Sequence, residues 1–316
     1  MDQDQDMHSG TAGPRLSENQ ALSTAVDMAV TCILLFQIVV GNMANVILFF
    51  HNVSPILLGS RPKPTQVIFC HLAIANVCLL STGIPPIMVA FVTRCPLSAL
   101  GCQVVYFIHH AAHVTVLCST SVLSTYQAVT LIPVSTGRMM TIRRHVLGLT
   151  SHSCCTCWAY SALVSVFVPM KITGPQDKLN HTHPHDPWFC SSQGGILGYV
   201  FLLFVSNAIF IGIMCWACGS TILLLYRHQK RQQQIHTSSH RHRGSPETRA
   251  AYTVLLLVVT FVLFYVVDSA FTFYITVYMR FSLWVLNVSC ILHVCFPTIS
   301  PVLLLLRDPR MPTFRF

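Results

Sequence analysis

Charged residues are scarce in this chain of 316 residues: Asp, Glu, Lys and Arg make up 9% of it, whereas hydrophobic residues make up 53%. Soluble domains carry about 25% charged residues, so the composition argues against a water-soluble fold. The N-terminus has neither the basic start nor the apolar stretch of a secretory signal peptide. We therefore expect the first apolar run to act as its own membrane-insertion signal.

Enzyme motifs are missing as well. The sequence contains no glycine-rich phosphate loop, no His-Glu-x-x-His and no Gly-x-Ser-x-Gly, and no pair of carboxylates lies within the apolar runs. We therefore expect a protein that is not an enzyme and uses no cofactor. Transporters more often show several intramembrane charges or internal repeats, and no clear repeat is visible, but a transporter remains an alternative.

Seven apolar runs follow one another with short polar gaps: residues 24–50, 65–92, 102–132, 146–169, 195–226, 250–278 and 281–306. At a helical rise of about 1.5 Å per residue, each can cross the ~30 Å hydrocarbon core of a bilayer. The sequence predicts an all-α membrane protein with a seven-transmembrane helix bundle. We expect an N-terminal tail over 1–23, the bundle over 24–306 and a short C-terminal tail over 307–316.

The orientation follows from the basic residues between the runs. With the N-terminus outside, fourteen Lys and Arg residues fall on the cytoplasmic side and five fall outside, as the positive-inside bias requires. We therefore predict an extracellular N-terminus and a cytoplasmic C-terminus. Because the formal charge of +9 is concentrated in alternate loops beside the lipid, it does not indicate nucleic-acid binding.

The outer segments hold two candidate modification sites. Asn180 begins an Asn-His-Thr acceptor sequence for glycosylation in the long loop 170–194. Most of the fourteen cysteines lie inside apolar runs, where a free cysteine behaves as a small hydrophobic residue. Cys95, Cys102 and Cys190 are the exceptions, and an oxidising exterior could join two of them or leave them as thiols.

Ionisable residues within the runs are candidates for function, because a charge inside the bilayer costs at least ~2.5 kcal/mol. Asp268 is the carboxylate deepest in any run, and His109 and His113 share one helical face at a comparable depth. We hypothesise that Asp268 pairs with a histidine of 102–132, although a protonated or water-linked Asp268 is the alternative. The two histidines are more simply buried polar groups or ligand contacts than a metal site, since no third metal ligand is evident.

Several strings of this sequence resemble the vomeronasal type-1 receptors, a branch of the seven-helix G-protein-coupled receptors. They are Arg61-Pro62-Lys63-Pro64-Thr65, His71-Leu72-Ala73-Ile74-Ala75-Asn76, Leu80-Ser81-Thr82-Gly83-Ile84-Pro85, Leu123-Ser124-Thr125-Tyr126-Gln127-Ala128, Ser245-Pro246-Glu247-Thr248-Arg249-Ala250, Thr260-Phe261-Val262-Leu263-Phe264-Tyr265 and Cys295-Phe296-Pro297-Thr298-Ile299-Ser300-Pro301. Together they extend from the first inner loop to the last apolar run. A bitter-taste-like receptor is an alternative within the same class.

The resemblance implies a receptor for pheromones or other small semiochemicals in the plasma membrane, coupled to a heterotrimeric G protein of the inhibitory class. It also implies a Cys102–Cys190 disulfide that ties the long outer loop and a glycan at Asn180. Like its relatives, the chain offers Ser124-Thr125-Tyr126 where rhodopsin-like receptors carry Asp-Arg-Tyr.

Two sets of residues are expected to carry that function. Polar or aromatic groups in the outer halves of the third, fifth, sixth and seventh runs are the candidate ligand contacts: His109, His113, Asn207, Tyr265, Asp268, Trp284 and Asn287. Charged residues at the cytoplasmic side are the candidate G-protein contacts: Arg138, Arg143, Arg144, Arg227, Lys230, Arg231, Glu247 and Arg249. The lipid phosphates and the positive-inside bias explain most of the basic residues equally well.

Overall fold

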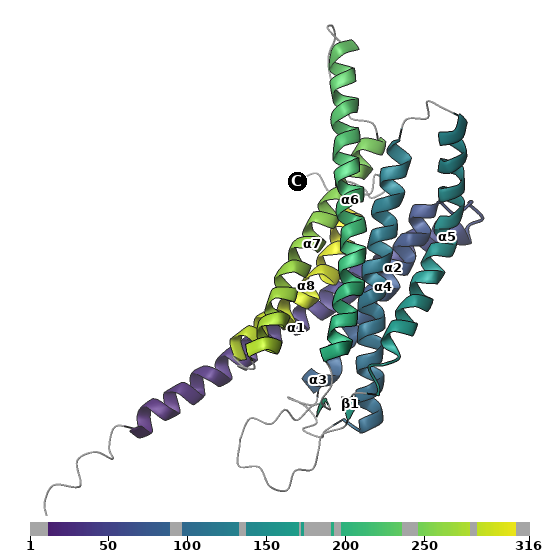
Figure 1. Ribbon diagram of the computed structural model, residues 1–316. Coiled ribbons are helices and arrows are strands. Elements are labelled where there is room, and N and C mark those ends of the chain that lie inside the picture. Colours follow the sequence, from purple (N-terminus) through teal and green to yellow (C-terminus); the bar gives the residue numbers. More distant parts are fainter. Residues whose placement is uncertain are drawn as a thin grey trace, which may run out of the picture.

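The fold is a bundle of long helices, seen in a computed structural model (Figure 1). It describes residues 12–88, 97–132, 137–170, 172–173, 191–192, 197–235, 246–278 and 283–307. The helices are α1 (Ala12–Leu57), α2 (Pro64–Ser81), α3 (Ile84–Met88), α4 (Ala99–Leu131), α5 (Gly137–Ser165), α6 (Leu197–Ile235), α7 (Pro246–Tyr278) and α8 (Leu283–Arg307). Two short antiparallel strands, β1 (Ile172–Thr173) and β2 (Ser191–Ser192), pair with each other, and β1 contacts α4.

The long helices confirm the prediction of a helical membrane bundle. Six segments of the described residues are long and apolar enough to cross a membrane: Thr24–Leu57, Pro64–Ser81, Ala99–Leu131, Phe201–Arg227, Val254–Phe271 and Asn287–Leu306. Helix α5 covers most of the remaining predicted run and is not among these six. Its composition is the reason, since residues 149–161 are rich in Thr, Ser, His and Cys.

The predicted run 65–92 is not one helix. Helix α2 ends at Ser81, and the short helix α3 begins at Ile84. Pro85 and Pro86 have no backbone N–H to continue the helical hydrogen bonds of α2, and the hydroxyl of Thr82 donates to the carbonyl of Leu79 at 2.6 Å. The chain therefore turns where the sequence was interpreted as a continuous span.

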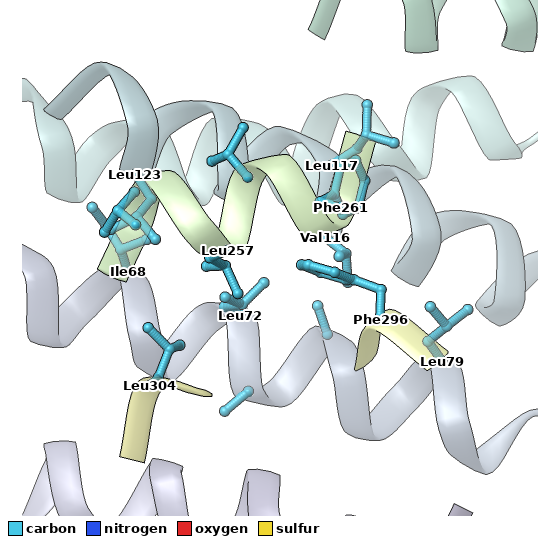
Figure 2. Packing of buried hydrophobic residues seen from close by; sticks show 14 of the residues in the cluster. Ile68, Leu72, Leu79, Val116, Leu117, Leu123, Leu257, Phe261, Phe296 and Leu304 are labelled. Carbon is cyan, nitrogen blue, oxygen red and sulfur yellow. The ribbon is translucent and has the colours of Figure 1, made fainter. Parts of the chain in front are cut away.

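Helix α4 lies at the centre of the bundle, where it contacts α2, α5, α6 and α7. Figure 2 shows the core that results, with Val116, Leu117 and Leu123 of α4 among side chains of α2, α7 and α8. Because lipid tails are as apolar as these side chains, close van der Waals packing, and therefore side-chain shape, favours these helix neighbours. The beginning of α4, the ends of α5 and α7 and both strands lie at one end of the bundle, which we name the hairpin end.

Two prolines open the hydrogen-bond ladder of α8, and neighbouring helices fill the opening. Pro301 has no N–H to donate to the carbonyl of Pro297 four residues earlier. The side-chain amide of Asn45 on α1 donates to that carbonyl at 2.9 Å. The amide of Asn76 on α2 donates in turn to Asn45 Oδ1 at 3.0 Å and to Ser300 Oγ at 3.1 Å. We name Asn45, Asn76 and Ser300 the asparagine network.

Helix α5 is joined to its neighbours by polar and covalent contacts. Trp158 Nε1 donates to His71 on α2 at 3.2 Å, and the hydroxyls of Tyr160 and Ser206 on α6 lie 2.8 Å apart. A disulfide joins Cys157 to Cys118 of α4. The interpretation of Cys118 as a free apolar side chain is therefore wrong, because packing brings two buried thiols together that lie 39 residues apart in sequence.

Candidate functional site

A row of polar and aromatic side chains crosses the hairpin-end half of the bundle. Its members come from α6, α7, α4, α8 and the turn after α2, and we name them the polar row: Asn207, Tyr265, His113, His293, His109 and Thr82. The imidazole of His293 lies between two others, with ring centroids 5.0 Å from His113 and 4.9 Å from His109. The ring planes differ by 14° and 24° respectively, so the three rings are stacked.

Helical spacing explains why the row is continuous. His109 and His113 are four residues apart on α4 and therefore share one face, which leaves room for one ring of α8 between them. Tyr265 extends the row on the other side, with its ring stacked on His113 at a centroid distance of 6.3 Å. Its hydroxyl interacts with the side chains of Asn207 and Ser269.

The other end of the row closes on the turn after α2. His109 Nδ1 lies 2.9 Å from Thr82 Oγ1. Because the single hydroxyl proton of Thr82 is already donated to the carbonyl of Leu79, Nδ1 of His109 must be the donor in this contact. The proline-enforced turn after α2 thus fixes the tautomer and orientation of a histidine on α4.

Asp268 of α7 is bound by α8 and not by α4. Its Oδ1 accepts a hydrogen bond from the hydroxyl of Ser289 at 2.8 Å, and its Oδ2 lies 3.3 Å from Nδ1 of His293. The hypothesis that Asp268 pairs directly with a histidine of 102–132 is therefore wrong. The hydrogen-bonded partner of the carboxylate is His293, which is half-buried and stacked between the two α4 histidines.

Two buried polar atoms of the row have no hydrogen-bond partner within the described part of the chain. They are Oδ1 of Asn207 and Nε2 of His293. Asn207 is 8% exposed, so water in the bulk does not reach its amide. A buried acceptor without a donor costs about 1–3 kcal/mol, and such atoms are therefore places where a bound molecule gains affinity.

The seven predicted ligand contacts are only partly brought together. His109, His113, Asn207 and Tyr265 belong to the polar row, and Asp268 contacts it through His293. Asn287 is half-buried on α8. Trp284 lies in the first turn of α8, and its side chain falls outside the described residues.

Sequence reasoning missed the central member of the row. His293 is the one residue among His, Asp, Glu, Lys and Arg within 283–306, so the rule that selected Asp268 as an intramembrane ionisable group would also have selected it. Thr82 and Ser289 gave no such signal, because hydroxyl groups are common in membrane helices and often bond to their own backbone.

Several predicted residues lie wholly or partly outside the described part. Cys102 is disulfide-bonded, but Cys190 and Asn180 fall outside the described residues, so the predicted pairing and the glycan remain predictions. Among the candidate G-protein contacts, Arg227 and Lys230 are exposed on α6. The side chains of the other six lie outside the described residues: Arg138, Arg143, Arg144, Arg231, Glu247 and Arg249.

The opposite end of the bundle contains a small cavity between α4, α6 and α7. It is lined by Ser124, Gln127, Cys218, Thr221, Val254 and Leu255. These side chains are uncharged, so no ion pair among them closes this end. Throughout the part of the chain that the structure describes, no group of three or more His, Cys, Asp or Glu side chains has a geometry that could hold a metal ion.

Comparison with known proteins gives one consistent result. The sequence model of the vomeronasal organ pheromone receptor family matches residues 28–316. The chain is 33% identical over 294 residues to human vomeronasal type-1 receptor 3, covering 90% of this chain and 93% of that one. It is 32% identical to human vomeronasal type-1 receptor 4, covering 90% of this chain and 95% of that one. It is 28% identical to zebrafish (Danio rerio) olfactory receptor class A-like protein 1, covering 88% of each chain.

Proposed function

Because the chain belongs to the vomeronasal organ pheromone receptor family, we propose that it binds a pheromone or another small semiochemical and signals through an inhibitory-class G protein. Family membership makes the protein a G-protein-coupled receptor of the plasma membrane and not an enzyme. The apolar helices agree with a multi-pass protein. The ligand, its site and the class of G protein are the new parts of the proposal.

The ligand binds at the polar row, between the hairpin-end halves of α4, α6, α7 and α8. The observation that carries this assignment is the half-buried stack of His109, His293 and His113, to which α4 and α8 contribute and which α7 extends. A polar group without a hydrogen-bond partner inside a membrane bundle carries a free-energy penalty. A ligand that forms a hydrogen bond with it removes this penalty and therefore binds more tightly. Asn287 and Trp284 on α8 remain further candidate contacts.

The hairpin end faces the outside. This assignment follows from the positive-inside bias and places the N-terminus outside and the C-terminus in the cytoplasm. Asn180 would then carry a glycan, and a Cys102–Cys190 disulfide would hold the long outer loop over the site. The bonded state of Cys102 supports this arrangement.

Signal transfer is a shift of population between two arrangements of the helices. A ligand that binds the active arrangement more tightly than the resting one increases its share. The G protein then binds at the opposite end, where Arg227 and Lys230 are exposed and the uncharged cavity beside Gln127 lies. The remaining candidate contacts are Arg138, Arg143, Arg144, Arg231, Glu247 and Arg249.

The test is agonist-dependent nucleotide exchange on a G protein in cells that display the full chain at the surface. A panel of volatile and steroid-like semiochemicals should give a dose-dependent signal that pertussis toxin abolishes. His113→Ala should raise the half-maximal concentration (EC50), whereas Thr156→Ala, a change of an exposed residue on α5, should not. Solute flux without nucleotide exchange would overturn the proposal in favour of a transporter.

A further inference from the structure

We infer that the ligand of the polar row is an uncharged molecule with a hydroxyl group, and that this hydroxyl donates its proton to Oδ1 of Asn207. The inference rests on the proposed function and names the chemical class of its ligand. Asp268 then acts as a positioning residue that holds His293 and does not itself touch the ligand. Two features of the polar row lead to this class, namely the type of its unpartnered atoms and the state of its one carboxylate neighbour.

Both unpartnered atoms of the row are hydrogen-bond acceptors. The Asn207 side chain interacts with the Tyr265 hydroxyl, and its Oδ1 is buried without a hydrogen-bond partner among the described residues. In His293, Nδ1 faces the carboxylate of Asp268 at 3.3 Å, so Nδ1 carries the proton and Nε2 of the neutral ring is an acceptor. A ligand that satisfies the row must therefore bring donors.

The two acceptors lie on one connected path. Tyr265 contacts Asn207 through its hydroxyl and His113 through its ring, and His113 is stacked on His293. Of the two atoms, Oδ1 of Asn207 is the stronger anchor because Asn207 is a buried residue, whereas His293 is half-buried.

A charged ligand does not fit this environment. No Lys or Arg lies within residues 99–131, 201–226, 254–278 and 283–306. A carboxylate or sulfate would therefore meet the Asp268 carboxylate with no Lys or Arg to pair with it. An ammonium group would have to compete for the Asp268 carboxylate with Ser289 and His293, which already contact its two oxygens. An uncharged donor avoids both penalties, and burial of a lone charge is far more costly than burial of a hydroxyl.

Matched probes test the inference. The panel consists of medium-chain alcohols, phenols and diols, the methyl ether of each, and amines and carboxylic acids of the same carbon skeletons. Methylation of the hydroxyl removes its proton and keeps its oxygen, so each alcohol and its methyl ether differ in the ability to donate a hydrogen bond. We expect each active alcohol to have an EC50 at least about tenfold lower than that of its ether, and amines and acids to be inactive at the same concentrations.

Three variants locate the donor's partner. Asn207→Leu removes the acceptor at nearly constant volume and should bring the ratio of ether to alcohol EC50 close to one. Tyr265→Phe removes the hydroxyl that interacts with Asn207 but keeps Oδ1, so the ratio should stay at about ten. Ser206→Ala removes a buried hydroxyl of the neighbouring residue, which is bonded to Tyr160, and should also keep the ratio.

Each outcome has a distinct meaning. Equal loss of the ratio in Asn207→Leu and Tyr265→Phe would make Asn207 a structural support and overturn the inference. Ethers as potent as alcohols, or an amine that depends on Asp268, would also overturn it while leaving the proposed receptor function intact. Silence toward every class, with surface display proven and a related receptor responding in parallel, would count against the proposed function itself.

Discussion

Replacement of Asn45 by Leu should destabilise the bundle more than any comparable change on α1. The side chain of Asn45 is fully buried, donates to the carbonyls of Gly41 and Pro297, and accepts from Asn76. Leucine has a similar volume but no polar atoms, so the Pro297 carbonyl loses its α1 donor and the Asn76 amide loses one acceptor. At about 1–3 kcal/mol for each group, the loss is roughly 2–6 kcal/mol.

The measurement is thermal unfolding of the detergent-solubilised protein. At about 2 °C per kcal/mol for a chain of this size, the midpoint should fall by about 4–12 °C. Asn52→Leu is the matched control, because Asn52 is 3% exposed on the same helix and donates within it, to the carbonyl of Leu48 at 2.8 Å. An equal fall in both variants would refute the argument that bonds between helices make the difference.

Three further changes have defined outcomes. Gly41→Ala would place a methyl group 2.8 Å from atoms on α2 and α8, so it should lower the free energy of unfolding by about 1–3 kcal/mol. Gly212→Ala is the control, because an added methyl group meets nothing within 4 Å there. It should be neutral or stabilising by up to ~1 kcal/mol. Cys118→Ala removes the cross-link to α5 and should lower the free energy of unfolding by about 2–4 kcal/mol. Cys215→Ala, at an exposed thiol, should leave this free energy almost unchanged. Peptide mapping that finds the Cys118 thiol free would contradict the disulfide. Asp268→Asn should raise the EC50 of every agonist by a similar factor, about tenfold, and loss confined to one chemical class would contradict its positioning role.

The helices could be predicted from the sequence because the bilayer sets a simple requirement. A run of about 20 residues without charge has few stable alternatives to a membrane-spanning helix. The boundaries were less certain, since helices continue into water: α1 begins at Ala12 and not at residue 24, and α6 continues to Ile235 and projects beyond its neighbours (Figure 1). Helix α7 begins at Pro246, four residues before the predicted run 250–278, because proline favours the first turn of a helix.

The residues of the site could be predicted in part, but the pairing of Asp268 with Ser289 and His293 could not. Depth along a helix can be counted from the sequence, which brought Asp268 and the two α4 histidines to one level. The direction in which a side chain points depends on how each helix is rotated in the bundle, and packing alone fixes that rotation. Ser289 and His293 lie four residues apart on the face of α8 that meets α7, so they and not α4 supply the partners of Asp268.

Helix α8 connects the two polar regions of the molecule. His293 lies four residues before Pro297, whose missing N–H leaves the carbonyl of His293 without its usual helical donor. The polar row holds this helix at His293, before its prolines, and the asparagine network holds it at Pro297 and Ser300. A helix with an opened ladder bends at lower cost than an intact one. A ligand that contacts His293 in the proposed site would therefore act next to the part of α8 that bends at the lowest cost, one turn before the carbonyl that Asn45 holds.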